Sequence, residues 1–216
     1  MFLKKNDVIL FQGDSITDSK RDRENYDDLG RGYAYLAASW LLSMYPELKL
    51  TFLNKGIGGN TVVDLNNRWK QDCIDIKPTC VSIMIGVNDC HKKFMELKDI
   101  IEPNELVEFK EVYRNILNQV KTTLNARIIL LDPYMLNVKE DFPIMRKRLN
   151  LYIDVVRELA QEFHTAYIPM DGIFAHASII APMTYWTPDG FHVSPAGSAL
   201  IARSWIKAVE EEKGDQ

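Results

Sequence analysis

The sequence predicts an α/β fold in which a parallel sheet lies between two layers of helices. Five short and nearly continuous apolar runs alternate with longer segments whose apolar residues recur at helical spacing. Continuous apolar runs are typical of parallel strands, because helices cover both faces of such a sheet. Strands that alternate with helices also imply right-handed crossovers. The predicted strands are residues 8–12, 50–54, 80–85, 127–131 and 166–168.

Four helices are predicted between and after these strands. Residues 61–76, 104–124 and 144–163 each carry one apolar stripe with a period of about 3.6 residues. The fourth helix is expected to begin after Ser194, because serine is a preferred N-cap and Pro195 suits the first helical turn.

The composition is that of a globular protein. The chain has 216 residues, of which 46% are hydrophobic and 26% charged, and this excludes a disordered or fibrous protein. No linker or repeat interrupts it, so a single domain over residues 1–216 is expected. The net charge of −4 argues against nucleic acid and membrane partners, because proteins that bind them are usually basic.

Cysteine usage and apolar run lengths predict a cytoplasmic location. No apolar stretch approaches the ~18 residues of a membrane span, and the run at residues 8–11 is too short for a signal peptide. Cys73, Cys80 and Cys90 lack the spacing of a disulfide framework and are expected to be reduced.

The segments that follow the first three strands are candidates for chemistry, because ligands of open parallel sheets bind outside the carboxyl ends of the strands. Ser15 lies in a turn that begins with Gly13 and would present a hydroxyl there, although serine is also common in turns and at helix N-caps. The stretch GIGGNT at residues 56–61 brings backbone N–H groups close to an anion, or is a flexible loop with an N-cap. Its final Thr61 does not fit a dinucleotide-binding loop. Asn88 offers an uncharged donor for an oxyanion, or closes an Asx turn.

Asp189 and His192 lie three residues apart in the turn before the last helix. This spacing lets a carboxylate orient an imidazole, although a lone pair of this kind is more often part of a surface turn. Considered together, the four segments supply a hydroxyl, close-approach glycines, an amide donor and an Asp–His pair. These are the components of acyl transfer: a nucleophile, an oxyanion hole, a base and a group that orients it.

The four ordered motifs resemble the SGNH superfamily of GDSL-type esterases and lipases, and the resemblance covers the whole chain. The stretches GDSITD, NKGIGGNT, PTCVSIMIGVND and HVSPAG are most similar to intracellular carbohydrate O-acetyl esterases of the acetylxylan esterase type. The resemblance implies a three-layer αβα sandwich with a flavodoxin-like, five-stranded parallel sheet in the order 2-1-3-4-5. It implies no metal and no cofactor.

The resemblance also implies the roles of five residues. Ser15 matches the nucleophile and provides one oxyanion donor through its own N–H. Gly59 matches the glycine donor, with Gly58 as the near alternative, and Asn88 matches the side-chain donor. Asp189 and His192 match the rest of the catalytic triad. The serine does not lie in G-x-S-x-G, so the α/β-hydrolase elbow is excluded.

The expected function is that of a serine carboxylester hydrolase that removes small acyl groups, in particular O-acetyl groups from xylo-oligosaccharide-like carbohydrate. A lysophospholipase or acyl-thioester hydrolase of the same fold is an alternative, because the motifs do not specify the leaving group. A non-catalytic binding module is a third hypothesis, against which the complete set of motifs argues. A homo-oligomer is compatible with this family, but no motif specifies one.

Candidate substrate-binding residues surround the motifs. The charged loop at residues 16–30, which includes Arg21, is either a solvated face or a polar rim for sugar hydroxyls. Tyr185 and Trp186, within residues 182–186, would form a stacking platform, an acyl wall, core or subunit contacts. His91 follows the Asn88 motif and is a candidate for the cleft wall.

Overall fold

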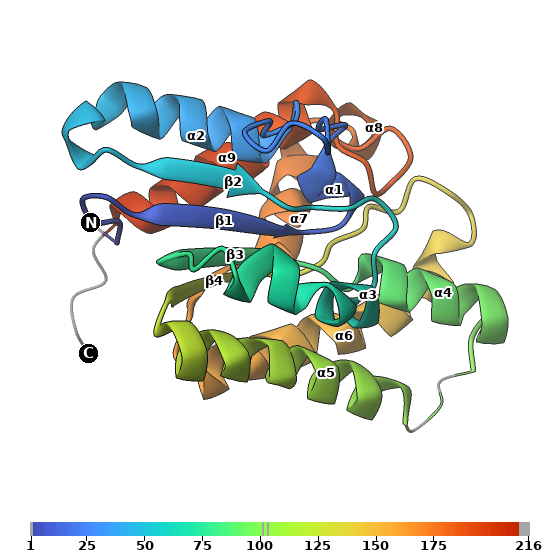
Figure 1. The fold of residues 1–216 in the computed structure, drawn as a ribbon. Helices are drawn as coiled ribbons and strands as arrows, with labels where there is room; N and C mark the ends of the chain where they lie inside the picture. Colours follow the sequence, from blue (N-terminus) through green and yellow to red (C-terminus); the bar gives the residue numbers. More distant parts are fainter. Residues whose placement is uncertain (1, 101, 103, 212–216) are drawn as a thin grey trace.

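Five parallel strands form one sheet in the computed structural model, with the order β2-β1-β3-β4-β5 (Figure 1). The structure describes residues 2–100, 102 and 104–211. The order and direction confirm the predicted flavodoxin-like sheet, and three strands differ from the prediction by one residue at one end. The strands are β1 Val8–Gly13, β2 Thr51–Asn54, β3 Cys80–Met84, β4 Arg127–Leu131 and β5 Ala166–Ile168.

Helices cover both faces of the sheet (Figure 1). One face packs against α2 Tyr33–Met44, α7 Met170–Ile180 and α9 Pro195–Glu210. The opposite face packs against α3 Val62–Asn67, α4 Val87–Leu97, α5 Glu105–Gln119 and α6 Phe142–Glu162. Within β1, Ile9 and Phe11 pack on the face covered by α2, α7 and α9, whereas Leu10 packs on the face covered by α3 to α6. The two layers of helices bury the apolar side chains on both faces of the sheet, and this burial stabilises the three-layer arrangement.

The predicted helices are present, but three further long helices, α2, α4 and α7, were not predicted. The predicted helices at 61–76 and 104–124 each end in a π-helical turn, Lys70–Ile74 and Val120–Leu124. Ser194 caps α9 as expected, because its hydroxyl accepts a hydrogen bond from the Gly197 N–H at 3.1 Å. The short elements are α1 Ser15–Asp18, the 3-10 turn Pro46–Leu48 and α8 Met183–Trp186.

Two findings concern the membrane and the thiols. Among the described residues, none of the helices has the length and apolar character needed to span a bilayer. Cys73, Cys80 and Cys90 are buried and form no disulfide.

Strand register brings the ends of β1, β2 and β3 to one edge of the sheet. Gly13 pairs with Met84, and Phe11 pairs with Asn54. In the sheet, β2 lies on one side of β1, whereas β3, β4 and β5 follow on its other side. The direction in which strands are added therefore reverses between β1 and β3, and this boundary is the topological switch point. Ligands of doubly wound folds bind at such a point, and the candidate segments all emerge there.

Candidate active site

Ser15 is the first residue of α1 and directly follows the sharp turn at the end of β1. The turn requires glycine at position 13, because a Cβ there would lie 2.4 Å from the Met84 carbonyl oxygen and from the Thr17 hydroxyl. Asp14 caps the short helix by accepting the Ile16 N–H at 3.0 Å. The Ser15 N–H lies at a helix start, where backbone donors have no partner within the helix.

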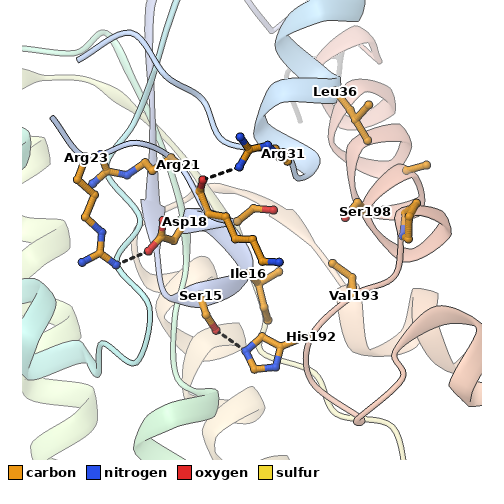
Figure 2. A pocket seen from close by; sticks show the side chains of 14 residues that line it. Ser15, Ile16, Asp18, Arg21, Arg23, Arg31, Leu36, His192, Val193 and Ser198 are labelled. Carbon is orange, nitrogen blue, oxygen red and sulfur yellow. Dashed lines mark hydrogen bonds and ion pairs between the residues drawn. The ribbon is translucent and has the colours of Figure 1, made fainter. Parts of the chain in front are cut away.

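A chain of hydrogen bonds joins Ser15, His192 and Asp189, and Figure 2 shows its first bond, between Ser15 and His192. The Ser15 Oγ lies 2.9 Å from His192 Nε2, and His192 Nδ1 lies 2.7 Å from Asp189 Oδ2. The other carboxylate oxygen of Asp189 accepts the backbone N–H groups of Phe191 and His192 at 3.0 and 2.8 Å. The carboxylate is therefore fixed by its own turn, and the three residues lie together as the sequence predicted.

The two glycines after β2 have different surroundings. The Gly58 N–H donates to Asp18 Oδ2 at 2.9 Å and is therefore occupied. The Gly59 N–H has no acceptor within the described part of the chain. Gly59 has φ +81°, a conformation that favours glycine, and a Cβ at this position would meet nothing within 4 Å. The geometry thus leaves Gly59, and not Gly58, with a donor to offer.

Asn88 lies in the first turn of α4, whereas the sequence analysis placed it in a loop after the third strand. Its side-chain Nδ2 donates to the Asn60 carbonyl oxygen at 3.0 Å, which leaves the second amide hydrogen free for a ligand. The neighbouring Asp89 accepts the Val62 N–H at the start of α3 at 3.0 Å. These bonds join the segments that follow β2 and β3.

The two aspartates near Ser15 have opposite pKa shifts. Burial raises the pKa of Asp14 to about 6, although the Ile16 N–H and the charge of His192 act in the other direction. Partial burial also acts to raise the pKa of Asp189. It is outweighed by hydrogen bonds from the His192 side chain and two backbone N–H groups, so the pKa of Asp189 is lowered. Asp189 is therefore ionised at neutral pH.

Arg68 on the turn after α3 holds the glycine segment against β1. Its guanidinium donates to Asn60 Oδ1 at 2.8 Å, to the Lys55 carbonyl at 2.7 Å and to Gln12 Oε1 at 3.0 Å. It also contacts the Gly13 carbonyl at 3.3 Å. Sequence reasoning missed this residue, since an arginine within a predicted helix resembles any solvent-facing position.

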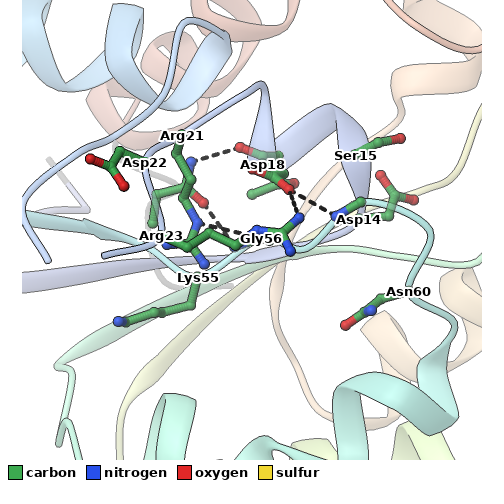
Figure 3. A network of polar contacts seen from close by, with 12 residues as sticks. Asp14, Ser15, Asp18, Arg21, Asp22, Arg23, Lys55, Gly56 and Asn60 are labelled. Carbon is green, nitrogen blue, oxygen red and sulfur yellow. Dashed lines mark hydrogen bonds and ion pairs between the residues drawn. The ribbon is translucent and has the colours of Figure 1, made fainter. Parts of the chain in front are cut away.

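A second polar network joins the charged loop to the glycine segment (Figure 3). Arg23 pairs with Asp18 at 2.5 Å, and the same carboxylate oxygen accepts the Gly58 N–H. The Arg21 Nε donates to the Gly56 carbonyl at 3.0 Å. The loop at residues 16–30 is thus attached to the site through one buried contact of Arg21 and partly buried contacts of Asp18.

A pocket of about 1050 Å³ opens beside Ser15 and His192. Of the candidate substrate-binding residues, Arg21 lines this pocket, whereas His91, Tyr185 and Trp186 do not. Trp186 lines a separate groove between α7 and α9 and donates to the Ala177 carbonyl at 3.0 Å. Tyr185 packs edge-on against Trp186, and His91 packs against Phe191. Among the described residues, no cluster of three or more His, Cys, Asp or Glu side chains is arranged to hold a metal ion.

The protein has the fold of an SGNH hydrolase, and a serine, a histidine and an aspartate are joined at the switch point of its sheet. These two features place it in the class of SGNH hydrolases. The model of the GDSL-like lipase/acylhydrolase family matches residues 11–200. The chain therefore belongs to this family and is a carboxylic ester hydrolase.

Individual relatives agree with the family. The chain is 33% identical to an acetylxylan esterase of Geobacillus stearothermophilus over 97% of this chain and 96% of the relative. A catalytic mutant of an acetylxylan esterase from the same organism superimposes with a TM-score of 0.87 at 30% identity, over the full length of both chains. A structure described as a GDSL-like lipase, from Parabacteroides merdae, gives 0.88 at 34% identity, over 96% of this chain and 97% of that one.

Proposed function

We propose that the protein is a serine esterase that removes acetyl groups from small carbohydrates through a Ser15–His192–Asp189 triad. The observation that carries this proposal is the continuous hydrogen-bond chain from the Ser15 hydroxyl to the Asp189 carboxylate. A catalytic mutant of the acetylxylan esterase relative, in which a serine is replaced, supports the same chemistry.

In the proposed mechanism, His192 Nε2 accepts the proton of the Ser15 hydroxyl while Oγ attacks the ester carbonyl carbon. Asp189 holds the imidazole through Nδ1 and stabilises the imidazolium that forms. The tetrahedral intermediate expels the alcohol, which takes the proton from His192. Water then attacks the acyl-enzyme with His192 as the base, and acetate and free Ser15 result.

The oxyanion of the tetrahedral intermediate needs donors that are already in place, because reorientation during the reaction would raise the barrier. We assign this role to the N–H groups of Ser15 and Gly59 and to the Asn88 side-chain amide. The Gly59 N–H and the second hydrogen of the Asn88 amide have no acceptor among the described residues, and Asn60 and Arg68 hold their positions. The donors are therefore available without breaking an existing bond.

The substrate class is proposed from the relatives and from the pocket. A curated relative that is 33% identical over 97% of this chain is an acetylxylan esterase, and charged side chains of the loop at residues 16–30 line one wall of the Ser15 pocket. A polar wall suits sugar hydroxyls better than an acyl chain. The cytoplasmic location stays a prediction from the sequence.

The test is hydrolysis of 4-nitrophenyl acetate compared with 4-nitrophenyl octanoate, followed by acetylated xylo-oligosaccharides. We expect acetate to be preferred, and Ser15→Ala to abolish turnover. Ser204→Ala is the matched control, because that hydroxyl only bonds the Leu200 carbonyl within α9. Preference for octanoate would favour the lysophospholipase or thioesterase alternative. Failure of a serine-directed phosphonate to label Ser15 would favour a binding module.

A further inference from the structure

The pocket beside Ser15 carries an excess of positive charge. Its lining includes four cationic side chains and a single carboxylate, that of Asp18. The protein as a whole has a net charge of −4, so this excess is local. The cationic residues are Lys20, Arg21, Arg23 and Arg31. Clefts lined by one sign of charge concentrate ligands of the opposite sign.

Arg23 and Arg21 hold the charged loop to the segment that follows β2. The Asp18 carboxylate pairs with Arg23 at 2.5 Å and also accepts the Gly58 N–H. Arg21 is nearly buried and uses its Nε for the Gly56 carbonyl. These contacts shape the loop and occupy Asp18, the only carboxylate among the described residues that line the pocket.

Lys20 and Arg31 differ from the other two. Both are exposed at the pocket, and neither forms an ion pair within the described part of the chain. The Arg31 guanidinium donates to the Lys20 carbonyl at 3.2 Å (Figure 2), and its backbone N–H donates to the Ser19 carbonyl at 3.0 Å. The two cations are therefore held together by bonds that leave most of their donors unused.

The backbone that carries Lys20 has a fixed and unusual shape. Ser19 and Lys20 both have positive φ, 43° and 59°, which side chains other than glycine rarely adopt. Gly30 and Gly32 close the loop from the other side. A Cβ on Gly30 would lie 2.5 Å from the Asp18 carbonyl oxygen, and one on Gly32 would lie 2.6 Å from the Ser19 side chain. Ser19 is the C-cap of α1, where a left-handed conformation is common, so these contacts fix the direction in which the loop leaves the helix.

One of these cations, that of Arg23, lies close to the reaction centre, and Lys20 and Arg31 line the same pocket. A Cβ on Gly58 would be 3.7 Å from the Ser15 Cβ and 3.9 Å from the Arg23 Nη2. The guanidinium of Arg23 is thus within the reach of one or two sugar units from the nucleophile. The opposite wall is apolar, with Leu36, Val193 and Ala199 among its residues. Charge recognition is therefore confined to the loop side of the pocket.

We infer that the natural substrate carries an anionic group, a carboxylate or a phosphate, on the sugar next to the acetyl ester, and that Lys20 and Arg31 bind it. This inference rests on the proposed esterase function and narrows its substrate. Arginine and lysine donors recognise both groups, arginine through two parallel N–H bonds. A uronic acid unit of an acetylated oligosaccharide supplies the carboxylate, and a sugar phosphate supplies the phosphate.

The test compares kcat/KM for three acetyl esters: an acetylated neutral xylo-oligosaccharide, its counterpart with a glucuronic acid substituent, and an acetylated xylose phosphate. We expect at least one anionic ester to exceed the neutral one by about tenfold or more, as for a gained charged hydrogen bond. The advantage should reside in KM and should shrink as salt is raised. The anionic ester with the larger advantage identifies the source of the charge.

Substitution then links the preference to these residues. In the Lys20→Gln/Arg31→Gln double variant the ratio of anionic to neutral kcat/KM should fall about tenfold. It should not change in Lys70→Gln, which alters an exposed lysine paired with Asp75 outside this pocket. Competition of glucuronate and inorganic phosphate with 4-nitrophenyl acetate, measured on the wild type, tests the same point without any variant.

A neutral preference in the wild type, or an unchanged ratio in the double variant, would overturn the inference and leave the esterase proposal intact. Absence of Ser15-dependent hydrolysis of every ester, 4-nitrophenyl acetate included, would instead overturn the proposed function.

Discussion

The two sides of Ser15 are built in different ways. His192 and Asp189, here called the base side, lie on one turn with side chains that are 61% and 44% exposed. Gly59 and Asn88, here called the donor side, lie on two segments that follow different strands. The base side depends on bonds within its own four residues, whereas the donor side depends on contacts between distant parts of the chain.

Arg68 shows what holds the donor side. Its guanidinium joins Asn60 and the Lys55 carbonyl, which follow β2, to Gln12 and the Gly13 carbonyl, which end β1. An arginine can serve several acceptors at once because its donors form a fixed fork. The comparison indicates that changes on the base side alter activity with little effect on stability. Changes to the residues that support the donor side should alter both activity and stability.

The largest effect is expected from Asp189→Asn on the base side. Asparagine cannot stabilise the imidazolium and favours the wrong tautomer, so kcat should fall by up to roughly 10⁴. Because the carboxylate is half-exposed and bonds only within its own turn, where an asparagine oxygen can still accept a backbone N–H, the free energy of unfolding should change little. Steady-state kinetics and chemical denaturation measure the two quantities, with the exposed Asp154→Asn as the matched control. A wild-type rate would mean that another acid orients His192.

On the donor side, Asn88→Ala should lower kcat by about 10² to 10³, the usual cost of one oxyanion donor. KM should change much less, since the missing bond forms mainly in the transition state. Asn115→Ala, which removes an exposed amide bonded to Asn66, is the control. An unchanged kcat would remove Asn88 from the oxyanion hole.

Arg68→Lys tests whether the hydrogen bonds of the Arg68 guanidinium hold the donor side in place. Lysine cannot reach all the acceptors of the guanidinium, so unfolding should become easier by about 2 to 4 kcal/mol. The donors should also shift enough to lower kcat about tenfold. Arg114→Lys, which changes an exposed arginine paired with Glu162, should have an effect below ~0.5 kcal/mol. Full activity together with full stability in Arg68→Lys would contradict the comparison.

The same contrast explains what the sequence could predict. The strands were predictable because each is a short apolar run, and the contact between Asp189 and His192 was predictable because the two residues lie within one turn. Helix α2 was missed since its sequence, YAYLAASWLLSM, is apolar on nearly every side and shows no stripe. Its outward face exposes Trp40 and Met44.

The supports of the donor side could not be predicted, because they depend on distant contacts. Arg68 and Gln12 are 56 residues apart in sequence, and Asp18 and Gly58 are 40 apart. Nothing local distinguishes these polar residues from solvent-exposed ones. Helix α4 is different, since Val87, Cys90 and Phe94 form a stripe that could have located it.

The smallest expected effect concerns Asp14, which lies beneath Ser15 and between the two sides. Its side chain is buried, and burial raises its pKa from 3.8 to about 6. Below pH ~3 the carboxyl is largely protonated in both the folded and the unfolded chain, whereas between pH ~4 and pH ~6 it is ionised mainly in the unfolded chain. As the pH rises through this window, the unfolded chain loses its proton first, so the folded wild type loses stability; above pH ~6 the loss is complete.

Asp14→Asn removes this titration and keeps the helix cap, because an asparagine oxygen also accepts the Ile16 N–H. The variant should gain stability relative to the wild type by about 2 to 3 kcal/mol between pH 4 and pH 7, with no further gain above. Denaturant titrations at several pH values measure the difference. A difference independent of pH would mean that Asp14 does not titrate across this range in the folded protein.

Asp189, whose pKa is lowered, contributes in the opposite sense: its stabilisation is present at neutral pH and is lost on acidification. The two aspartates beside one serine thus distinguish a carboxylate that is destabilised by burial from one that is stabilised by its hydrogen bonds.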